Sequence, residues 1–276
     1  MTKFSLLISV YAKENPIHFS QCLDSILAQT VLPDELIIVK DGPLSNELEN
    51  ILQNLHFSNE IIIIPLLESV TQGPARAEGV KVAKNEWVAI MDSDDLCRPD
   101  RFEKQLKMIE ENPELGLIGG QIAEFAEEPE NTTATRIVPV SHTDIIKFAK
   151  KRNPFNQMTV MFKRSIALDA GNYRYFPGFE DYDLWMRMIK CDAICANHPE
   201  ALVNARVGGG MYGRRRGRKY IRSEWQMQKQ LKELSFINNI EFIRNSLMRI
   251  PVRLLPESAL AVVYNLFARK RMQKKE

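Results

Sequence analysis

The chain has 276 residues, 45% of them apolar, so it is long enough to bury one large core with or without an appendage. Its net charge of +2 hides an uneven distribution, because residues 205–276 carry 17 Lys and Arg against 5 Asp and Glu, whereas the remainder carries 20 against 30. An acidic body with a basic tail indicates two surfaces with different partners, and an anionic membrane or a nucleic acid would suit the tail.

Cysteine spacing and hydropathy exclude several classes of protein. The four cysteines have neither zinc-binding nor redox spacing, so we expect reduced thiols in a cytosolic protein. No apolar run approaches the roughly 20 residues that a transmembrane helix needs, and the N-terminus lacks the charged-then-apolar pattern of a signal segment. We therefore expect a protein that neither crosses a membrane nor is secreted by that route.

The first third of the chain alternates buried strands with amphipathic helices. Near-continuous apolar runs predict strands covered on both faces, and apolar residues spaced three or four apart predict the helices between them. The expected strands are 4–10, 36–39, 61–66 and 87–90. One helix is expected to begin at Pro16, a second to span 44–55, and a third to follow the turn at 72–76 and continue to Ala83. This order predicts a parallel, right-handed, doubly wound α/β sheet.

An acidic cluster, Met91–Asp95, follows the fourth of these strands. Parallel α/β sheets bind their ligands at the carboxyl ends of strands, where the loop with Asp41 and the turn with Arg76 are also expected. Three crowded carboxylates repel one another unless a cation shares the site, and Mg²⁺ or Mn²⁺ held together with substrate phosphates would relieve that repulsion. The alternative is a solvated acidic loop that caps a helix beginning at Pro99.

The middle of the chain is less regular. We expect a strand pair or a bend at Leu115–Ile122 and a polar loop over Glu124–Thr135. A strand is expected at Met158–Phe162, followed by a short helix over Arg164–Ala170. Phe179–Ile189 is predicted to be a helix whose first turn is acidic, as the helix dipole favours, and whose apolar face packs in the core.

A dinucleotide-binding dehydrogenase is excluded because the glycine fingerprint is absent after the first strand. Val10–Asn15 contains no glycine, the glycine-rich stretch Val207–Gly217 lies far downstream, and a phosphate-binding P-loop is missing.

Six short motifs resemble those of the family-2 glycosyltransferases and stand in the same order. They are Leu7–Tyr11, Ser25–Thr30, Val39–Gly42, Gly73–Arg76, Asp92–Asp95 and Glu180–Trp185. The resemblance covers residues 1 to about 207 and is nearest to bacterial enzymes that assemble O-antigen or capsule. It implies a GT-A fold, a nucleotide-sugar donor and inversion at the transferred sugar.

The resemblance also assigns residues to the donor. Asp41 would accept a hydrogen bond from the nucleotide base, in a pocket lined by Val10 and Tyr11. Glu14 is a further residue expected to contact the donor. A turn aspartate before Gly42 is the alternative for Asp41.

Four residues are assigned to the remainder of the donor. Arg76 would contact the nucleotide, its alternative being a surface arginine on a helix, and Asp92 would lie near the ribose with Ser93 beside it. Asp94 would coordinate the metal, Mn²⁺ or Mg²⁺, that neutralises the leaving diphosphate. Asp95 would support Asp94 or cap the next turn.

Asp181 is the candidate general base, because inversion needs one carboxylate to take the proton of the acceptor hydroxyl. Glu180 would contact the acceptor, and plain helix capping is the alternative for both. Two positions depart from the family: Lys40 stands where an acidic residue is common, and Gln157 where many relatives have a histidine. Neither departure touches the expected metal ligand or base.

The basic tail begins with the loop Gly208–Arg218, which resembles an RNA-binding tract in isolation. In a glycosyltransferase, Arg214 and Arg215 would instead fold over a diphosphate. We expect one long helix over Tyr220–Phe242, followed by apolar segments beside Lys and Arg up to Ala268. These segments suit an interfacial membrane helix, and packing against the body or a second copy in a homodimer is the alternative.

The sequence thus predicts a GT-A catalytic domain over 1–207, with a donor half (1–113) and an acceptor half (114–207), and a basic helical extension over 208–276. We expect sugar transfer from a UDP-sugar to a glycan or lipid-linked sugar at the cytoplasmic face of the inner membrane, with no nucleic acid partner. The alternatives are a sugar-phosphate nucleotidyltransferase and a non-catalytic nucleotide- or RNA-binding protein.

Overall fold

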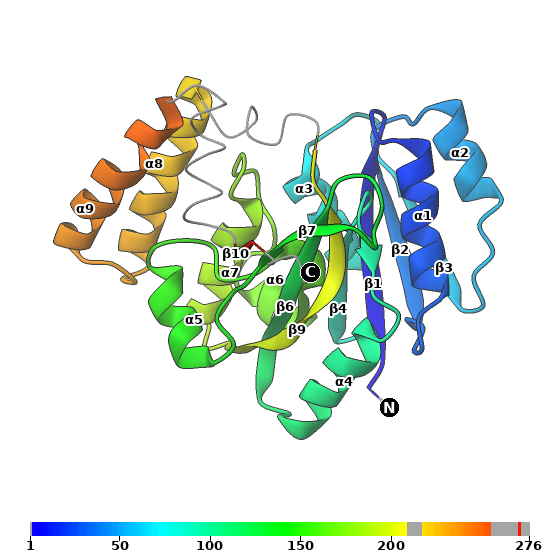
Figure 1. The fold of residues 1–276 in the computed structure, drawn as a ribbon, viewed down its shortest axis with the longest axis horizontal. Coiled ribbons are helices and arrows are strands. Elements are labelled where there is room, and N and C mark those ends of the chain that lie inside the picture. Colours follow the sequence, from blue (N-terminus) through cyan, green and yellow to red (C-terminus); the bar gives the residue numbers. More distant parts are fainter. Residues whose placement is uncertain (1, 209–216, 255–269, 272–276) are drawn as a thin grey trace, which may run out of the picture.

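The structure, a computed structural model, describes residues 2–208, 217–254 and 270–271. These residues form a mixed sheet with helices on both faces and a helical hairpin at one end (Figure 1). The strand order along the sheet is β10-β7-β6-β8-β4-β1-β2-β3, and β9 pairs with β6 and β5. The α/β class predicted from the sequence is confirmed.

The half of the sheet formed by the first four strands is parallel throughout. Its strands are β1 (Phe4–Tyr11), β2 (Glu35–Asp41), β3 (Glu60–Pro65) and β4 (Trp87–Asp92), with β1 between β2 and β4. Alternate side chains of β1 enter two cores, Leu7 on one face and Leu6 and Ile8 on the other. Burial on both faces explains why these strands appear in the sequence as continuous apolar runs.

Helices on opposite faces cover these strands. The helices α1 (Pro16–Leu27), α2 (Asn46–Gln53) and α4 (Arg101–Glu111) contribute Phe19, Leu48 and Phe102 to one core. Helix α3 (Gln72–Val82) packs on the other face. Asn15 caps α1 by accepting the amide protons of two first-turn residues, and a proline follows it at the first helical position.

The second half of the sheet differs from two of our expectations. Residues 115–122 are not a strand pair or a bend but part of one buried strand, β6 (Leu115–Phe125). The predicted polar loop over 124–135 contains the strand β7 (Thr132–Arg136), which pairs with β6. The strands β5 (Leu96–Cys97), β8 (Met161–Lys163) and β9 (Ile194–Arg206) complete this half, and β10 (Lys270–Arg271) pairs with β7.

The glycines of β6 explain the first misinterpretation. A Cβ atom on Gly119 would lie 2.5 Å from Asn197 Oδ1, and one on Gly120 would lie 2.5 Å from Leu202 Cδ1. Both neighbours belong to β9, so the glycines let two strands and their side chains approach closely. Glycine inside a strand marks such an approach as well as a bend.

The helices of the second half are α5 (His142–Ala149), α6 (Arg164–Asp169) and α7 (Glu180–Lys190), with a short 3₁₀ turn at Gln157–Thr159. Helix α7 has the predicted acidic first turn and apolar face. Trp185 is fully buried among Phe155, Phe162 and Tyr173, with ring centroids 5.6–6.2 Å away. Its position in the core fixes the orientation of α7 and therefore of the residues that begin it.

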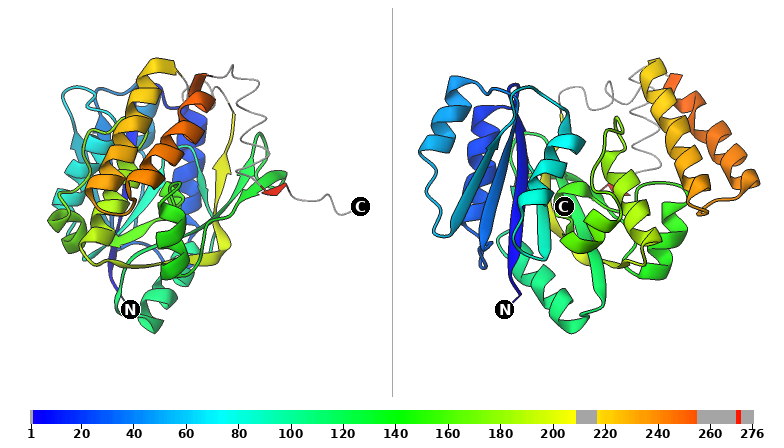
Figure 2. Two further views of the ribbon diagram at one scale, coloured as in Figure 1. Left: turned by 90° about the vertical axis from the view of Figure 1, so that its left-hand side faces the viewer. Right: turned by 180° about the vertical axis from the view of Figure 1, so that it is seen from behind.

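The predicted single helix over 220–242 is wrong, because the chain turns back on itself. Helix α8 (Gly217–Glu233) ends before Ser235, whose φ is +65°, and α9 (Asn239–Arg249) begins after the cap residue Asn238. Asn238 and Glu241 form a reciprocal capping box, which stabilises the new helix start. A 3₁₀ turn, Pro251–Leu254, follows. Figure 2 shows the α8–α9 hairpin standing beside the body, at the end away from α1 and α2.

Among the residues that the structure describes, none of the helices is both long and apolar enough to cross a bilayer. The apolar segment expected over 258–268 lies outside the described residues.

Candidate active site

The carboxyl ends of three parallel strands bring the predicted donor residues to one edge of the sheet. Tyr11 at the end of β1 lies opposite Asp41 at the end of β2, and Ser9 lies opposite Asp92 at the end of β4. Val10 is buried beneath this edge, whereas the Tyr11 ring is exposed. The strand registers therefore create the strand-end grouping that the sequence predicted.

Asp41 is buried and organises the loop after β3. Its Oδ1 accepts the Val70 amide proton at 2.7 Å, and its Oδ2 accepts the Ser69 hydroxyl proton at 3.0 Å. Gly42 has a φ of +85°, and a Cβ there would lie 2.9 Å from the Ser69 nitrogen. Each carboxylate oxygen keeps a second lone pair, so the same side chain can hold the loop and accept from a ligand.

Arg76 is buried, so the alternative of a surface arginine is wrong. It lies in the first turn of α3, and its Nη2 donates to Asp92 Oδ1 at 2.5 Å. Its Nε is buried and has no hydrogen-bond partner. A guanidinium paired on one side and unpaired at Nε can still donate to an anionic ligand.

Asp94 and its acidic neighbours form a cluster of carboxylates at the end of β4. Burial and the charges of Asp92 and Glu14 raise the pKa of Asp94 to about 6. Glu14 accepts a hydrogen bond from the Ser93 hydroxyl, which ties the loop after β1 to the acidic cluster. Crowded, partly desolvated carboxylates of this kind are stabilised by a bound cation.

Asp95 has a structural role that the sequence did not show. It is buried, and its Oδ1 accepts the backbone N–H of Arg206 at 2.7 Å, while the Arg206 side chain donates to the Asp94 carbonyl at 3.2 Å. Burial and the charges of Asp94 and Asp92 raise the pKa of Asp95. The end of β9 is thereby attached to the acidic cluster.

The carboxylate oxygens of Asp94 and Asp92 are ligands that Mn²⁺ and Mg²⁺ accept, and their mutual repulsion fits a cation site. Within the described ranges, however, the His, Cys, Asp and Glu side chains form no group of three or more that could by itself hold a metal. One or two carboxylates completed by the phosphates of a donor would make a site of the magnesium type.

Asp181 lies in the first turn of α7 and is held by two hydrogen bonds. Its Oδ2 accepts from Asn153 Nδ2 at 2.6 Å and its Oδ1 accepts the Tyr182 amide proton at 2.7 Å. Burial raises the pKa of Asp181, and the positive charges of Arg76 and Arg136 lower it in part. A carboxylate with a raised pKa is a stronger base than a free aspartate.

Glu180 packs against the first turn of α3. A Cβ on Gly73 would lie 2.7 Å from Glu180 Cγ, so the glycine permits the contact between α3 and α7. Burial and the Asp181 charge raise the pKa of Glu180, and Arg76 lowers it. Arg76 thus influences the acidic residues of β4 and of α7 at once, which unites the predicted donor and acceptor groups in one electrostatic site.

Sequence reasoning missed three side chains of this site: Asn153, Tyr173 and Arg206. Gln157, recognised as a departure from the family, donates to the Tyr173 hydroxyl at 3.1 Å. Burial raises the pKa of Tyr173, and the charges of Arg76, Asp181 and Asp92 all influence it. The departure at Gln157 was the available signal that this loop approaches the site. The other departure, Lys40, forms an ion pair with Glu49 on α2 at 2.5 Å.

Arg214 and Arg215 lie outside the described residues, so their expected contact with a diphosphate stays a prediction.

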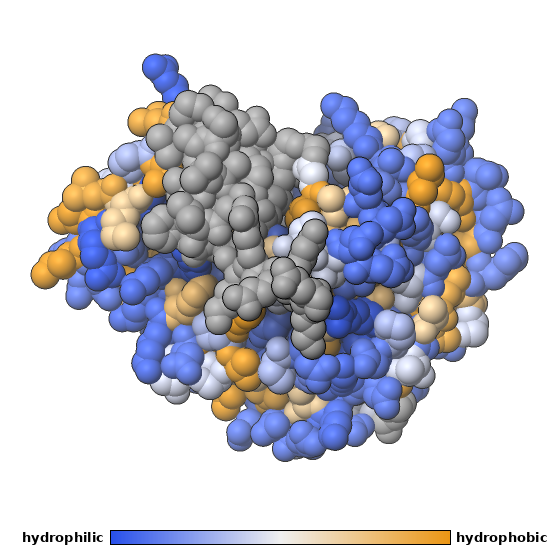
Figure 3. All heavy atoms as spheres, viewed as in Figure 1, coloured by the Kyte–Doolittle hydropathy of each residue, from blue (hydrophilic) through white to orange (hydrophobic). Residues whose placement is uncertain are grey.

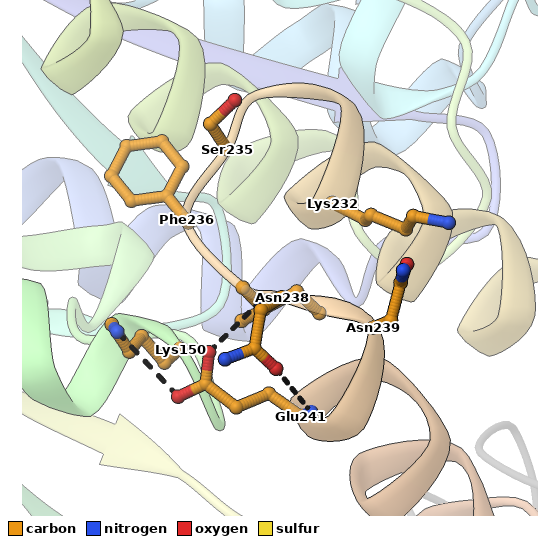
Figure 4. Close-up of a pocket in the computed structure, with 8 residues that line it drawn as sticks. Lys150, Lys232, Ser235, Phe236, Asn238, Asn239 and Glu241 are labelled. Atoms are coloured by element: carbon orange, nitrogen blue, oxygen red, sulfur yellow. Dashed lines mark hydrogen bonds and ion pairs between the residues drawn. The ribbon is translucent and has the colours of Figure 1, made fainter.

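A hollow of about 480 Å³ lies elsewhere, at the turn between α8 and α9. Figure 4 shows Lys150, Ser235, Phe236 and Glu241 around it, with Lys150 Nζ 3.5 Å from Glu241 Oε1. None of its lining residues belongs to the carboxylate site. The capping box of α9 lies on one side of the hollow, and Glu241, its acidic lining residue, is already paired with Lys150 and bonded to the Asn238 amide.

Comparison with protein families matches the model described as Glycosyl transferase family 2 over residues 5–170. An uncharacterized glycosyltransferase of Haemophilus influenzae is 40% identical over 97% of this chain and 100% of its own. The amylovoran biosynthesis glycosyltransferase AmsE of Erwinia amylovora is 37% identical over 95% of this chain and 97% of its own. The UDP-Gal:alpha-D-GlcNAc-diphosphoundecaprenol beta-1,3-galactosyltransferase of Escherichia coli is 32% identical over 97% of both chains.

Two solved structures share the fold at low sequence identity. TarS 1–349 of S. aureus, in complex with UDP-GlcNAc, superposes with a TM-score of 0.68 at 14% identity, covering 97% of this chain and 74% of that one. The mannosyltransferase PcManGT of Pyrobaculum calidifontis, in complex with GDP-Man and Mn²⁺, gives 0.65 at 15% identity, covering 96% and 75%.

Proposed function

The chain belongs to glycosyl transferase family 2, with relatives in polysaccharide biosynthesis, and from this premise we propose that it transfers a sugar from a UDP-sugar to a lipid-linked glycan with inversion. The observation that carries the proposal is the position of Arg76, which bonds Asp92 at the donor edge and influences Asp181 at the start of α7. One site then contains a place for a diphosphate and a base for an incoming hydroxyl.

The donor would bind across the strand ends. Asp41, Val10, Tyr11 and Glu14 would hold the nucleotide base and its surroundings, because Asp41 lies at the end of β2 beside Tyr11. The names of two similar proteins, one a UDP-Gal galactosyltransferase and one solved with UDP-GlcNAc, support a UDP-sugar.

The sugar-phosphate part of the donor would lie farther along the same edge. Asp92 and Ser93 would contact the ribose, and Arg76 the diphosphate. Asp94 would hold Mn²⁺ or Mg²⁺, which when bound supplies positive charge to the leaving diphosphate.

Asp181 would take the proton of the acceptor hydroxyl as its oxygen attacks the anomeric carbon from the face opposite the leaving diphosphate. A single displacement of this kind inverts the configuration and needs one carboxylate base. Asn153 would hold the base in place, since its amide donates to the carboxylate oxygen that Tyr182 leaves free. The hydrogen bonds and the charge of Arg76 favour the ionised form of the base and oppose the effect of its burial.

The acceptor would approach from the α7 side. Glu180 would contact it, and Arg214 and Arg215 would pair with its diphosphate if it is attached to a polyprenyl carrier. On this proposal residues 1–113 and 114–207 are the donor and acceptor halves, and 208–276 is an extension directed to the lipid. A lipid-linked acceptor places the reaction at the cytoplasmic face of the membrane.

The test is transfer to a synthetic acceptor that carries one sugar on a short polyprenyl diphosphate. Purified protein is incubated with UDP-, GDP- and dTDP-sugars, with Mn²⁺, Mg²⁺ or a chelator, and NMR determines the anomeric configuration of the product. We expect transfer from a UDP-sugar with divalent metal and an inverted product. Retained configuration, or equal rates in chelator, would contradict the mechanism. Formation of a nucleotide sugar from sugar phosphate and nucleoside triphosphate would favour the nucleotidyltransferase alternative instead.

A further inference from the structure

The outer side of α9 is a row of exposed apolar side chains. Ile240, Ile243, Leu247 and Met248 are 78%, 57%, 70% and 66% exposed, and their spacing places them on one side of the helix. Leu254, just beyond, is 67% exposed. Figure 3 shows apolar side chains along the left-hand edge of the molecule, where α9 lies in Figure 1. We call these five residues the α9 apolar face.

The opposite side of α9 holds buried polar residues beside Phe242, which packs on the core and on Trp225. Asn245 is 4% and Ser246 is 6% exposed. Asn245 Nδ2 donates to the Lys150 carbonyl at 2.8 Å and to Gln228 Oε1 at 3.2 Å. A helix that packs on a body and faces water buries its apolar side and exposes its polar side. In α9 the exposed side is mainly apolar, and the buried positions are the polar residues Asn245 and Ser246.

Helix α8 also buries polar side chains, beside the apolar Met227 and Leu231. Glu224 and Gln228 are fully buried, and Glu224 pairs with Arg249 of α9 at 2.5 Å. Burying a charge is costly unless it is paired. The hairpin nevertheless buries Glu224, paired with Arg249, while the α9 apolar face remains exposed. We therefore expect the partner that contacts the α9 apolar face to be at least partly apolar.

Positive charge surrounds the apolar face. Residues 217–254 carry eight Lys and Arg against three Asp and Glu. Arg244 lies between the apolar residues on α9, and Arg222, Lys229 and Lys232 are exposed on α8. Lys232 Nζ is 5.6 Å from the Phe242 ring centroid, so its charged end lies beside the apolar part of the hairpin. Residues 255–276 add five cations against two acids.

We propose that the α9 apolar face docks onto an anionic lipid bilayer, with α9 lying parallel to its surface. Apolar side chains between cations are the chemistry of an interfacial helix, in which the former enter the acyl boundary and the latter meet lipid phosphates. At 11 residues α9 is too short to cross the bilayer, so it lies on the surface.

A second copy of the chain fits this face less well than a bilayer does. A two-fold interface through α9 would bring the Arg244 side chains and the surrounding lysines of both copies together. Like charges at close range oppose association, whereas anionic headgroups attract the same residues. The charge of the hairpin thus selects the bilayer as the partner.

The inference rests on the proposed function only in choosing the membrane that holds the lipid-linked acceptor. It places the surface that contacts lipid on α9, next to the segment that positions the base. Asn245 and Arg249 donate to the carbonyls of Lys150 and Lys151, and Asn153 follows two residues later.

Vesicle sedimentation tests the proposal with the full chain and without donor or acceptor, so its outcome does not depend on the proposed reaction. The vesicles contain either phosphatidylcholine alone or phosphatidylcholine with phosphatidylglycerol. We expect binding to the anionic vesicles only, weakened by salt, and reduced roughly tenfold or more in the double variant Ile240→Ser, Leu247→Ser.

The matched control is Leu67→Ser, Val82→Ser, which removes two exposed apolar side chains far from α9. We expect it to sediment as the unaltered chain does, and both variants to keep the thermal unfolding midpoint because all four positions are exposed. Unchanged vesicle binding by the α9 variant would overturn the proposal. A dimer in lipid-free buffer that only the α9 variant dissociates would also overturn it, in favour of a second copy.

Discussion

Replacing Asp181 with asparagine removes a charge but keeps the shape of the side chain. In the native structure Oδ1 accepts from the Tyr182 amide and Oδ2 accepts from Asn153 Nδ2. An asparagine that keeps the first bond presents its own NH₂ group to Asn153. Rotating the Asn153 amide would remove the clash between donors, but its Oδ1 already accepts the Phe155 amide proton at 3.1 Å. The variant therefore loses one of the three hydrogen bonds.

The two contributions to stability oppose each other. The lost hydrogen bond and the unpaired donor cost about 1–3 kcal/mol. Removing a buried charge whose pKa is raised by burial gains part of that back. We expect the free energy of unfolding to change by less than about 2 kcal/mol. The rate of sugar transfer should change much more, because loss of a positioned general base lowers a rate by about 100- to 10,000-fold.

The assay measures release of nucleoside diphosphate in the presence of acceptor, and titration calorimetry measures nucleotide affinity. We expect kcat to fall by at least about 100-fold while the Kd for UDP stays within twofold. The unaltered enzyme should lose kcat/KM as pH falls through the pKa of Asp181, and the variant should lack that limb. Asp144→Asn, also in the first turn of a helix but exposed, is the matched control and should retain full activity. Transfer by Asp181→Asn within tenfold of the unaltered rate would refute its assignment as base.

Three further changes probe the rest of the site. The pKa of Asp94 is raised from 3.8 to about 6, so the native state holds a proton that the unfolded chain releases, and metal-free stability should fall as pH rises from about 4 to 6. Asp94→Asn should reduce that slope without removing it, because burial also raises the pKa of Asp95 and Asp181. It should raise metal-free stability at pH 7 by roughly 1–2 kcal/mol after allowance for solvent, and remove the gain in UDP affinity from Mn²⁺ seen by calorimetry; a variant that keeps the gain would contradict the metal assignment. Arg76→Met leaves Asp92 without its partner and should lower the free energy of unfolding, measured in urea, by about 3 kcal/mol. Arg76→Lys should lower it by an intermediate amount. An unchanged unfolding midpoint would show that the Arg76–Asp92 pair does not stabilise the fold. Gly73→Ala places a methyl group 2.7 Å from Glu180 Cγ, so transfer should fall more than nucleotide affinity, with a stability loss of about 1–3 kcal/mol by thermal unfolding; equal transfer would show that α3 and α7 can separate at no cost to the reaction.

The N-terminal half of the fold, with strands β1 to β4, was predictable because its sequence signals are local. Strands β1, β2 and β4 are buried on both faces and appear as apolar runs, each followed by polar residues at a strand end. The start of helix α1 is marked in the sequence by Asn15 and a proline. In the structure Asn15 caps the helix and the proline is its first residue. The strand ends meet at one edge by the geometry of parallel pairing, so Asp41 and Asp92 could be grouped before any coordinates were known.

The second half of the fold, with strands β6 to β9, depends on contacts between distant segments. Strand β9 contains proline, glutamate and asparagine, and it forms because β6, about eighty residues earlier, pairs with it along most of its length. Asn153 looks like an ordinary loop amide, and its bond to Asp181 exists only because α7 packs its tryptophan in the core beneath. The turn between α8 and α9 was not predicted because its left-handed position is occupied by Ser235 and not by a glycine, the residue that marks such turns in a sequence.

The contacts of α9 bear on how the site is held together. Arg249 bonds Glu224 of α8 and the Lys151 carbonyl, and Asn245 bonds the Lys150 carbonyl, so the inner side of α9 holds the backbone that follows α5. Asn153 extends from the same stretch to the Asp181 carboxylate. Polar residues on the inner side of α9 are needed for these bonds, because an apolar side chain in place of Asn245 would leave the Lys150 carbonyl without this donor. The two sides of α9 therefore differ in their contacts: polar residues of the inner side hold the segment that leads to Asn153, and the apolar residues of the outer side are exposed.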